Sequence, residues 1–277
     1  MPPSVLEGGS WRGARRLRKM TAQPSTASGR SRRPGFWLGV AGEVSLTVGV
    51  VGLLFFGWYL GVNDWIQGSS QARSASEVAS QWDSETPDTF GKARGESDGS
   101  ATAVDPPVVG DVTEGDAFAV LYVPRFGDTY ARTIAEGVDL QTVLNSRELG
   151  VGRYPQTAQF GELGNVGIAG HRTTYGASFS EIGELRAGDR LYVEVEQGWY
   201  SYQFRNLEYV WPTQVEVLAP IPHQPEAEAT ERLLTLTSCH PRFSEAERII
   251  AYAVFDAWYP RGGGPPAEIA TVASEVT

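Results

Sequence analysis

The sequence predicts a mainly β domain, a barrel with a few short helices, preceded by one transmembrane helix. Three observations carry this prediction. Residues 44–62 form an apolar run without a charge, residues 67–116 contain few apolar side chains, and residues 117–260 contain short β-rich segments separated by glycine and proline. Many short strands in one segment of this length favour a closed barrel over an open sheet.

Residues 1–34 are predicted to form a basic cytoplasmic tail. They hold eight Lys or Arg and one acidic residue, Glu7, although the whole chain has a net charge of −10. The remainder is therefore strongly acidic and offers no cationic surface to phosphates, which argues against nucleic acid as a partner.

Residues 35–66 are predicted to contain a single membrane-spanning helix. The uncharged run 44–62 would extend about 28 Å as a helix, close to the thickness of the hydrocarbon layer. The arginines on its N-terminal side predict a cytoplasmic N-terminus and an extracellular main domain. A cleaved signal peptide and a buried core helix are the alternatives, but the run is long for a signal peptide and no clear cleavage site follows it.

Residues 67–116 are predicted to be a flexible extracellular linker, because they have few apolar residues and no usable period. Residues 261–277 follow the last expected strand and are predicted to be a C-terminal tail. Helical period is weak and confined to pieces such as residues 129–150. The expected strands lie in residues 117–127, 164–172, 190–212, 214–220, 232–239 and 248–260. Within 190–212 the stretches on either side of Gln197 and Gly198 alternate apolar and polar residues, which predicts a pair of half-buried strands.

Cys239 is the only cysteine of the chain, so it has no partner for an intramolecular disulfide. An unpaired cysteine is unusual in an oxidising extracellular environment. A thiol attacks carbonyl groups as the thiolate, and for this it needs an imidazole and a positive charge nearby. The alternative is a small buried hydrophobic residue in an apolar strand.

The chain has three histidines that could supply this imidazole. His240 follows Cys239 directly, but neighbouring side chains of a strand point to opposite faces. His223 lies in a loop rich in proline and acidic residues and is most simply a surface residue. His171 ends a glycine-rich strand and remains the candidate, although such a histidine is more often structural when taken alone.

Arg248 is the candidate for the positive charge. It begins the strand after the loop that follows Cys239, so a hairpin would return it beside the thiol. A guanidinium is permanently charged and can stabilise a thiolate or the oxyanion of a tetrahedral intermediate. A solvated salt bridge is the alternative. No metal and no cofactor is expected, because the chain lacks ligand-spaced Cys or His pairs and any dinucleotide or phosphate-binding glycine motif. The acidic cluster at 226–231 could bind Ca²⁺ weakly, but an exposed acidic loop explains it as well.

These motifs resemble those of the sortases, and specifically of class E. The segment TLTSC at 235–239 is followed nine residues later by Arg248, and GHR at 170–172 lies upstream. Residues 150–179 are similar to the class E pattern along most of their length. One departure is Ser238, where the family usually has threonine.

The resemblance implies an eight-stranded sortase barrel in a cysteine transpeptidase of the cell membrane. Such an enzyme cuts secreted proteins at a C-terminal signal of the type Leu-Ala-x-Thr-Gly or Leu-Pro-x-Thr-Gly, between Thr and Gly. It then transfers the protein to an amine of a cell-wall precursor. A thiol peptidase that uses water, a pilin-polymerising sortase that uses a lysine amine and a non-catalytic binding module are the alternatives.

The resemblance also assigns roles to residues. Cys239 is implied as the nucleophile that forms a thioester, His171 as the general acid and base, and Arg248 as the group that stabilises the oxyanion. The loop 218–231 is implied as one wall of the substrate groove. The implied substrate-binding residues are Tyr154, Leu236, Thr237 and Ser238.

Overall fold

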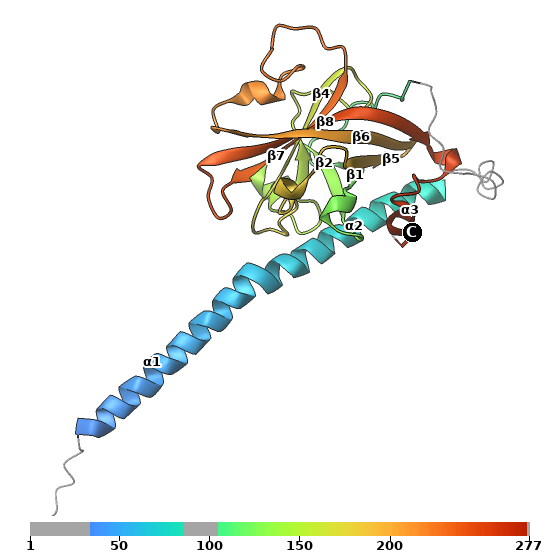
Figure 1. Ribbon diagram of the computed structural model, residues 1–277. Helices are drawn as coiled ribbons and strands as arrows, with labels where there is room; N and C mark the ends of the chain where they lie inside the picture. The colour runs from blue at the N-terminus through green and yellow to red at the C-terminus, as the bar shows by residue number, and fades with distance from the viewer. Residues whose placement is uncertain (1–33, 86–104, 276–277) are drawn as a thin grey trace, which may run out of the picture. The chain divides into compact units, whose positions relative to one another are not determined.

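The structure is a computed structural model that describes residues 34–85 and 105–275 (Figure 1). The predicted tail, apart from Pro34, and residues 86–104 of the predicted linker lie outside the described residues. The chain divides into two compact units, which meet in sequence between Val50 and Val51.

Helix α1, Pro34–Gly57, contains the predicted membrane-spanning segment. Residues Gly35–Gly57 are long enough and apolar enough to cross a bilayer, and the protein buries none of them. Large apolar side chains such as Leu46, Leu53 and Phe56 are exposed along this helix. Exposed apolar surface on this scale is costly in water and favourable in lipid, so the helix is consistent with a membrane anchor.

The predicted flexible linker is wrong for residues 67–85. After one π-helical turn, η1 at Trp58–Val62, the chain forms helix α2, Asn63–Glu85. Gln71, Ala75 and Ala79 are buried at a spacing of four, which defines one packed face of the helix. The sequence is poor in apolar residues because this face buries alanine and an amide instead of large side chains.

Residues 105–116 also belong to the folded domain, although they contain no helix or strand. Val109 N donates to Phe160 O at 2.9 Å, and the hydroxyl of Tyr200 donates to Pro107 O at 2.7 Å. Residues 105–116 of the predicted linker are therefore not a flexible tether.

Eight strands close into a barrel in the order β1-β2-β3-β4-β7-β8-β6-β5, which confirms the predicted fold (Figure 1). The pairs β2–β3 and β4–β7 are parallel and the others are antiparallel. The strands are β1 Ala117–Tyr122, β2 Ala131–Glu136, β3 Val151–Arg153, β4 Gly164–Gly170, β5 Arg190–Val195, β6 Gly198–Val210, β7 Arg232–His240 and β8 Glu247–Pro260.

Some elements differ from the prediction. The weakly helical segment 129–150 contains strand β2 and one π-helical turn, η4 at Leu140–Leu144. Strand β2 is buried on both faces, so its sequence shows no alternation. The expected strand at 214–220 is a 3₁₀ turn, η6 at Val215–Leu218.

The predicted C-terminal tail packs against the domain. After a 3₁₀ turn, η7 at Arg261–Gly263, the chain ends in helix α3, Ala270–Glu275. Ile269 is buried in one cluster with Ala75 of α2. Arg261 adds ion pairs to Asp83 of α2 at 2.8 Å and to Glu194 of β5 at 2.9 Å. Strand β5, helix α2 and the C-terminal segment are therefore joined by one guanidinium.

Arg153 and Glu136 form a buried ion pair beneath the start of the loop after β3. Both side chains are nearly inaccessible, and two bonds of 2.7 Å join the guanidinium to the carboxylate. Arg153 Nη1 also donates to Thr157 O at 2.8 Å and to Ala158 O at 3.1 Å.

We expect Arg153→Met to lower the free energy of unfolding by about 3–5 kcal/mol, because it leaves the Glu136 carboxylate buried without its partner. Thermal unfolding followed by near-UV circular dichroism measures this. Arg190→Met is the matched control, because Arg190 pairs with Asp256 at an exposed site, where a loss of at most about 1 kcal/mol is expected. Equal losses in the two variants would contradict the prediction.

Candidate active site

Cys239 and Arg248 lie opposite each other on neighbouring strands. Cys239 is half-buried near the end of β7, and the antiparallel register pairs it with Arg248 near the start of β8. Side chains at directly opposed positions have Cβ atoms about 4.5–5.5 Å apart on the same face of a sheet. The hairpin therefore returns Arg248 to the position opposite Cys239, as the sequence predicted.

His171 reaches the same end of the barrel through the parallel pair β4–β7. The last registered pair is Ala169 with Thr237, and the Ser238 hydroxyl donates to Gly170 O at 2.7 Å. His171 follows Gly170 as Cys239 follows Ser238, so His171 and Cys239 lie at the same end of the paired strands β4 and β7. Strand pairing thus places Cys239, Arg248 and His171 at the same end of the barrel.

The imidazole of His171 has contacts with two loop residues. Its Nε2 lies 2.8 Å from Asn145 Oδ1, and its ring lies 5.1 Å from the ring of Tyr175. Because an amide oxygen accepts, Nε2 carries the proton and Nδ1 is the nitrogen that can accept one. Among the described residues the imidazole donates to Asn145, and it makes no hydrogen bond to Cys239.

Burial sets the protonation of His171. Desolvation lowers the pKa of the imidazole below its ordinary value, and the negative charge of Asp64 opposes this shift in part. Removal from water disfavours the charged form of a base. His171 is therefore mostly neutral near pH 7 and can accept a proton there.

Arg248 is held by its own hairpin. Nη1 donates to the carbonyl oxygens of Glu245 and Glu247, both at 3.0 Å. Within the described part of the chain no carboxylate forms an ion pair with it, so the salt-bridge alternative is not the one observed. The guanidinium is instead fixed by neutral carbonyl groups, which leave its charge uncompensated.

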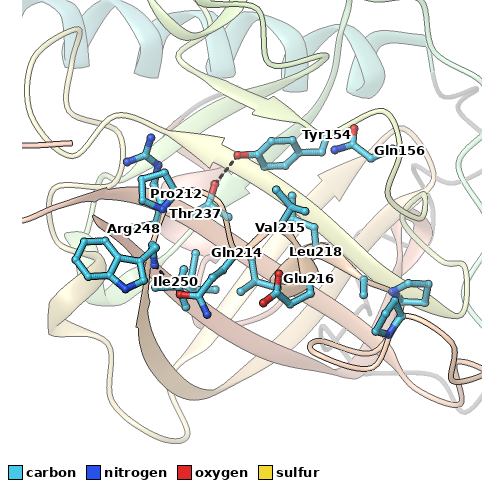
Figure 2. A pocket seen from close by; sticks show the side chains of 16 residues that line it. Tyr154, Gln156, Pro212, Gln214, Val215, Glu216, Leu218, Thr237, Arg248 and Ile250 are labelled. Atoms are coloured by element: carbon cyan, nitrogen blue, oxygen red, sulfur yellow. Dashed lines mark hydrogen bonds between the residues drawn. The ribbon is translucent and has the colours of Figure 1, made fainter. Parts of the chain in front are cut away.

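A groove begins beside Arg248 and runs along the barrel surface (Figure 2). Its cavity has a volume of about 680 Å³, within the range of typical ligand sites. Tyr154, Thr237 and Arg248 line it on the sheet side, and the hydroxyls of Tyr154 and Thr237 lie 3.0 Å apart. The opposite wall consists mainly of residues 210–220, from the end of β6 through η6, with Pro225 as a further contact.

The groove wall opposite the sheet does not lie where the sequence predicted it. The sequence placed it at 218–231, yet of this range only Leu218, Ala219, Pro220 and Pro225 line the groove. Gly167 of β4 has a definite role here, because a Cβ atom at this position would lie 2.6 Å from Leu218 Cδ2. A larger residue at this position would displace the Leu218 side chain where η6 crosses the sheet.

Leu236 and Ser238 do not line the groove. Leu236 is completely buried in the barrel core, and Ser238 is 4% exposed with its hydroxyl bound to Gly170 O. Side chains of a strand alternate between faces, so Thr237 and Cys239 share one face and Leu236 and Ser238 share the other. Their side chains therefore point away from the groove, and of the predicted substrate-binding residues only Tyr154 and Thr237 line it.

The other two histidines lie where the sequence placed them. His240 packs its ring against Tyr209, with ring centroids 4.5 Å apart. His223 pairs with Glu208 on the surface at 2.9 Å. Sequence reasoning missed Asn145, Tyr175 and Asp64, because they come from two loops and a helix whose patterns carry no sign of a site. Within the described residues no group of three or more His, Cys, Asp or Glu could hold a metal ion.

Comparison with known proteins agrees with this geometry. A family model, Sortase domain, matches residues 121–256. The sortase SrtA of Actinomyces oris has a solved structure that superposes with a TM-score of 0.57 at 39% identity, over 61% of this chain and 96% of that one. The chain therefore belongs to the sortase family.

Within the family, the similarity is to class E. Sortase SrtE1 of Streptomyces coelicolor is 30% identical over 247 residues, which are 86% of this chain and 63% of that protein. A structure of sortase E1 from the same species, with a tripeptide in its active site, superposes with a TM-score of 0.52 at 33% identity, over 56% of this chain and 97% of that one. The chain thus spans less than two thirds of the full length of SrtE1.

Proposed function

We propose that the protein is a membrane-anchored transpeptidase that cleaves a C-terminal sorting signal between Thr and Gly and transfers the released carbonyl to an amine. The observation that carries this proposal is the register of Cys239 against Arg248, which lines an apolar groove, with His171 directly after the end of the adjacent strand β4. These are the groups that acyl transfer through a thioester requires.

In the first half of the reaction, the sulfur of Cys239 attacks the carbonyl carbon of the threonine. A carbon–sulfur bond forms and the peptide carbon–nitrogen bond breaks. The thiol proton passes to His171 and from there to the leaving amine of glycine. Arg248 stabilises the negative charge that develops on the carbonyl oxygen.

In the second half, an amine attacks the thioester carbon. A carbon–nitrogen bond forms, the carbon–sulfur bond breaks, and His171 takes the proton that the amine loses and returns it to the sulfur. The acceptor that we propose is an amine of a cell-wall precursor. Secreted proteins with a sorting signal are the proposed acyl donors.

The groove gives the signal a place to bind. Its lining combines apolar residues such as Val215, Leu218 and Ile250 with the hydroxyls of Tyr154 and Thr237. The tripeptide in the structure of the related sortase E1 supports a peptide as its occupant. Tyr154 and Thr237 remain the proposed substrate-binding residues, without Leu236 and Ser238.

The membrane helix supports the same function. We propose that the basic N-terminus is cytoplasmic and the barrel extracellular, as the positive-inside rule predicts. When enzyme, signal-bearing protein and precursor share one membrane, their effective concentrations rise without any additional contact.

We expect the full-length protein in detergent to cleave a Leu-Ala-x-Thr-Gly peptide and, with an added amine, to yield the amide of the shortened peptide. Mass spectrometry of the products measures this, with a scrambled peptide as control and a Leu-Pro-x-Thr-Gly peptide to define the preference. Free acid as the sole product at saturating amine would identify a thiol peptidase instead. Peptide binding without a product would identify a binding module.

A further inference from the structure

Gln71 of helix α2 is completely buried, and its side chain joins the helix to two loops. Its Nε2 donates to Ser146 O at 3.1 Å and to Tyr175 O at 3.0 Å. Its Oε1 accepts from the Ser178 hydroxyl at 3.3 Å. The buried amide therefore uses both of its N–H donors and its oxygen acceptor in hydrogen bonds to residues that lie 75 to 107 positions away in the sequence.

These two segments determine the surroundings of His171. Ser146 adjoins Asn145, whose Oδ1 lies 2.8 Å from the imidazole, and Tyr175 packs its own ring against it. We call residues 137–150 the Asn145 loop and residues 171–180 the His171 loop. Gln71 thus fixes the backbone at Tyr175 and next to Asn145, which are the two residues that hold the imidazole.

The His171 loop needs such support because its backbone is strained. Thr174, Tyr175 and Ala177 have φ angles of 67°, 50° and 45°. Residues other than glycine rarely adopt this left-handed region and persist there only where surrounding structure holds them. Helix α2 supplies a second bond here, since Asp64 Oδ2 accepts from Thr174 N at 3.2 Å.

Two glycines make room for the Gln71 amide. A Cβ atom at Gly150 would lie 2.3 Å from Gln71 Nε2, and one at Gly176 would lie 2.5 Å from Gln71 Oε1. Both glycines also have positive φ angles, 91° and 81°. Each loop therefore has a glycine at its contact with Gln71, and a larger residue at either position would clash with the buried amide.

We propose that α2 is part of the active-site scaffold and that Gln71 is a positioning residue that acts on His171 through the Asn145 loop and the His171 loop. The kinetic consequence rests on the proposed transpeptidation. A displacement of about 1 Å in a catalytic group can lower a rate about 100-fold, and release of these loops would displace both contacts of the imidazole.

The test is Gln71→Met in the full-length protein, which keeps the length of the side chain and removes its three hydrogen bonds. We expect kcat to fall about 10- to 100-fold with KM within about twofold, because the groove is not altered. We also expect the pKa of His171 to rise toward its ordinary value as water enters the loops. NMR of histidine-labelled protein measures it, and His171→Gln identifies its signal among the three histidines.

Gln81→Met is the matched control. Gln81 is an exposed glutamine of the same helix, about 15 Å along the axis from Gln71. Kinetic constants and a His171 pKa equal to those of the wild type are expected for this variant.

The charge that acts on the imidazole is Asp64 of α2. Tyr175 faces the His171 imidazole from the same loop, and Cys239 and Arg248 lie at the ends of the adjacent strands. Asp64→Asn provides a second test if Gln71→Met does not fold. Loss of this negative charge should lower the pKa of His171, the opposite direction from Gln71→Met, and an unchanged pKa would overturn the proposal.

A lower melting temperature of Gln71→Met with unchanged kcat and unchanged His171 pKa would also overturn it, because Gln71 would then only stabilise the fold. An inactive wild type would instead contradict the proposed function. In that case the His171 pKa still decides the role of α2, because that measurement requires no turnover.

Discussion

Cys239→Ala is expected to abolish cleavage of a Leu-Ala-x-Thr-Gly peptide and to leave the barrel folded. Without the sulfur no thioester forms, and loss of a catalytic nucleophile lowers kcat by factors of about 10⁶ in well-studied proteases. Cys239 is half-buried near the end of β7, so a side chain smaller by one atom should change the free energy of unfolding by about 1 kcal/mol or less.

The measurement compares turnover, peptide affinity and melting temperature of the two proteins. The variant should still bind peptide, because the groove residues Tyr154, Thr237 and Val215 are untouched. Intact-mass spectrometry should detect an acyl adduct on the wild type and none on the variant. Cleavage that persists in Cys239→Ala would assign the reaction to another group and end the proposed mechanism.

Arg248→Lys is expected to lower kcat about 100- to 1000-fold with little change in KM. One donor directed at an oxyanion is worth about this factor. The guanidinium has five N–H donors in a plane, and Nη1 is bound to the carbonyl oxygens of Glu245 and Glu247. A lysine ammonium has three donors and no planar fork, so it cannot keep these bonds and also reach the substrate from the same position.

Arg205→Lys is the control for this prediction. Arg205 lies exposed on β6 and pairs with Glu231 at 3.6 Å. The same loss of a guanidinium there should leave kcat within about twofold of the wild type, because exposed pairs contribute little. Rates of Arg248→Lys equal to those of the wild type would remove Arg248 from the mechanism.

The sequence predicted those parts of the fold that leave a periodic or local pattern. The strands around Gln197 and Gly198 alternate apolar and polar residues and were expected as a pair, which is what β5 and β6 form. The register of Cys239 against Arg248 follows from one hairpin, so it could also be anticipated.

Other predictions differ from the structure, and each difference has its own physical cause. Strand β2 is buried on both faces and shows no alternation, so its sequence does not predict a strand. Helix α2 buries Gln71, Ala75 and Ala79, and small or polar side chains give no apolar signal. Leu236 and Ser238 were assigned to the groove because they adjoin Thr237 and Cys239 in sequence, although a strand turns adjacent side chains to opposite faces.

Asn145 could not be predicted, because its contact with His171 depends on a loop whose path is set by tertiary packing. The same holds for Asp64, which lies in the segment predicted to contain the membrane helix, and for Gln71, which lies in the predicted linker. Long-range hydrogen bonds of this kind connect residues with no shared periodicity.

The parallel pairing of β4 with β7 has a consequence for the biosynthesis of the protein. Residues 164–170 and 232–240 are neighbours in the barrel, yet synthesis separates them by the whole of β5 and β6. Ribosomal translation delivers the chain from its N-terminus, and contacts of high sequence separation form late in folding. A partly synthesised chain therefore holds His171 with no thiol beside it, and the proposed chemistry cannot begin until β7 and β8 have been made and have joined the barrel.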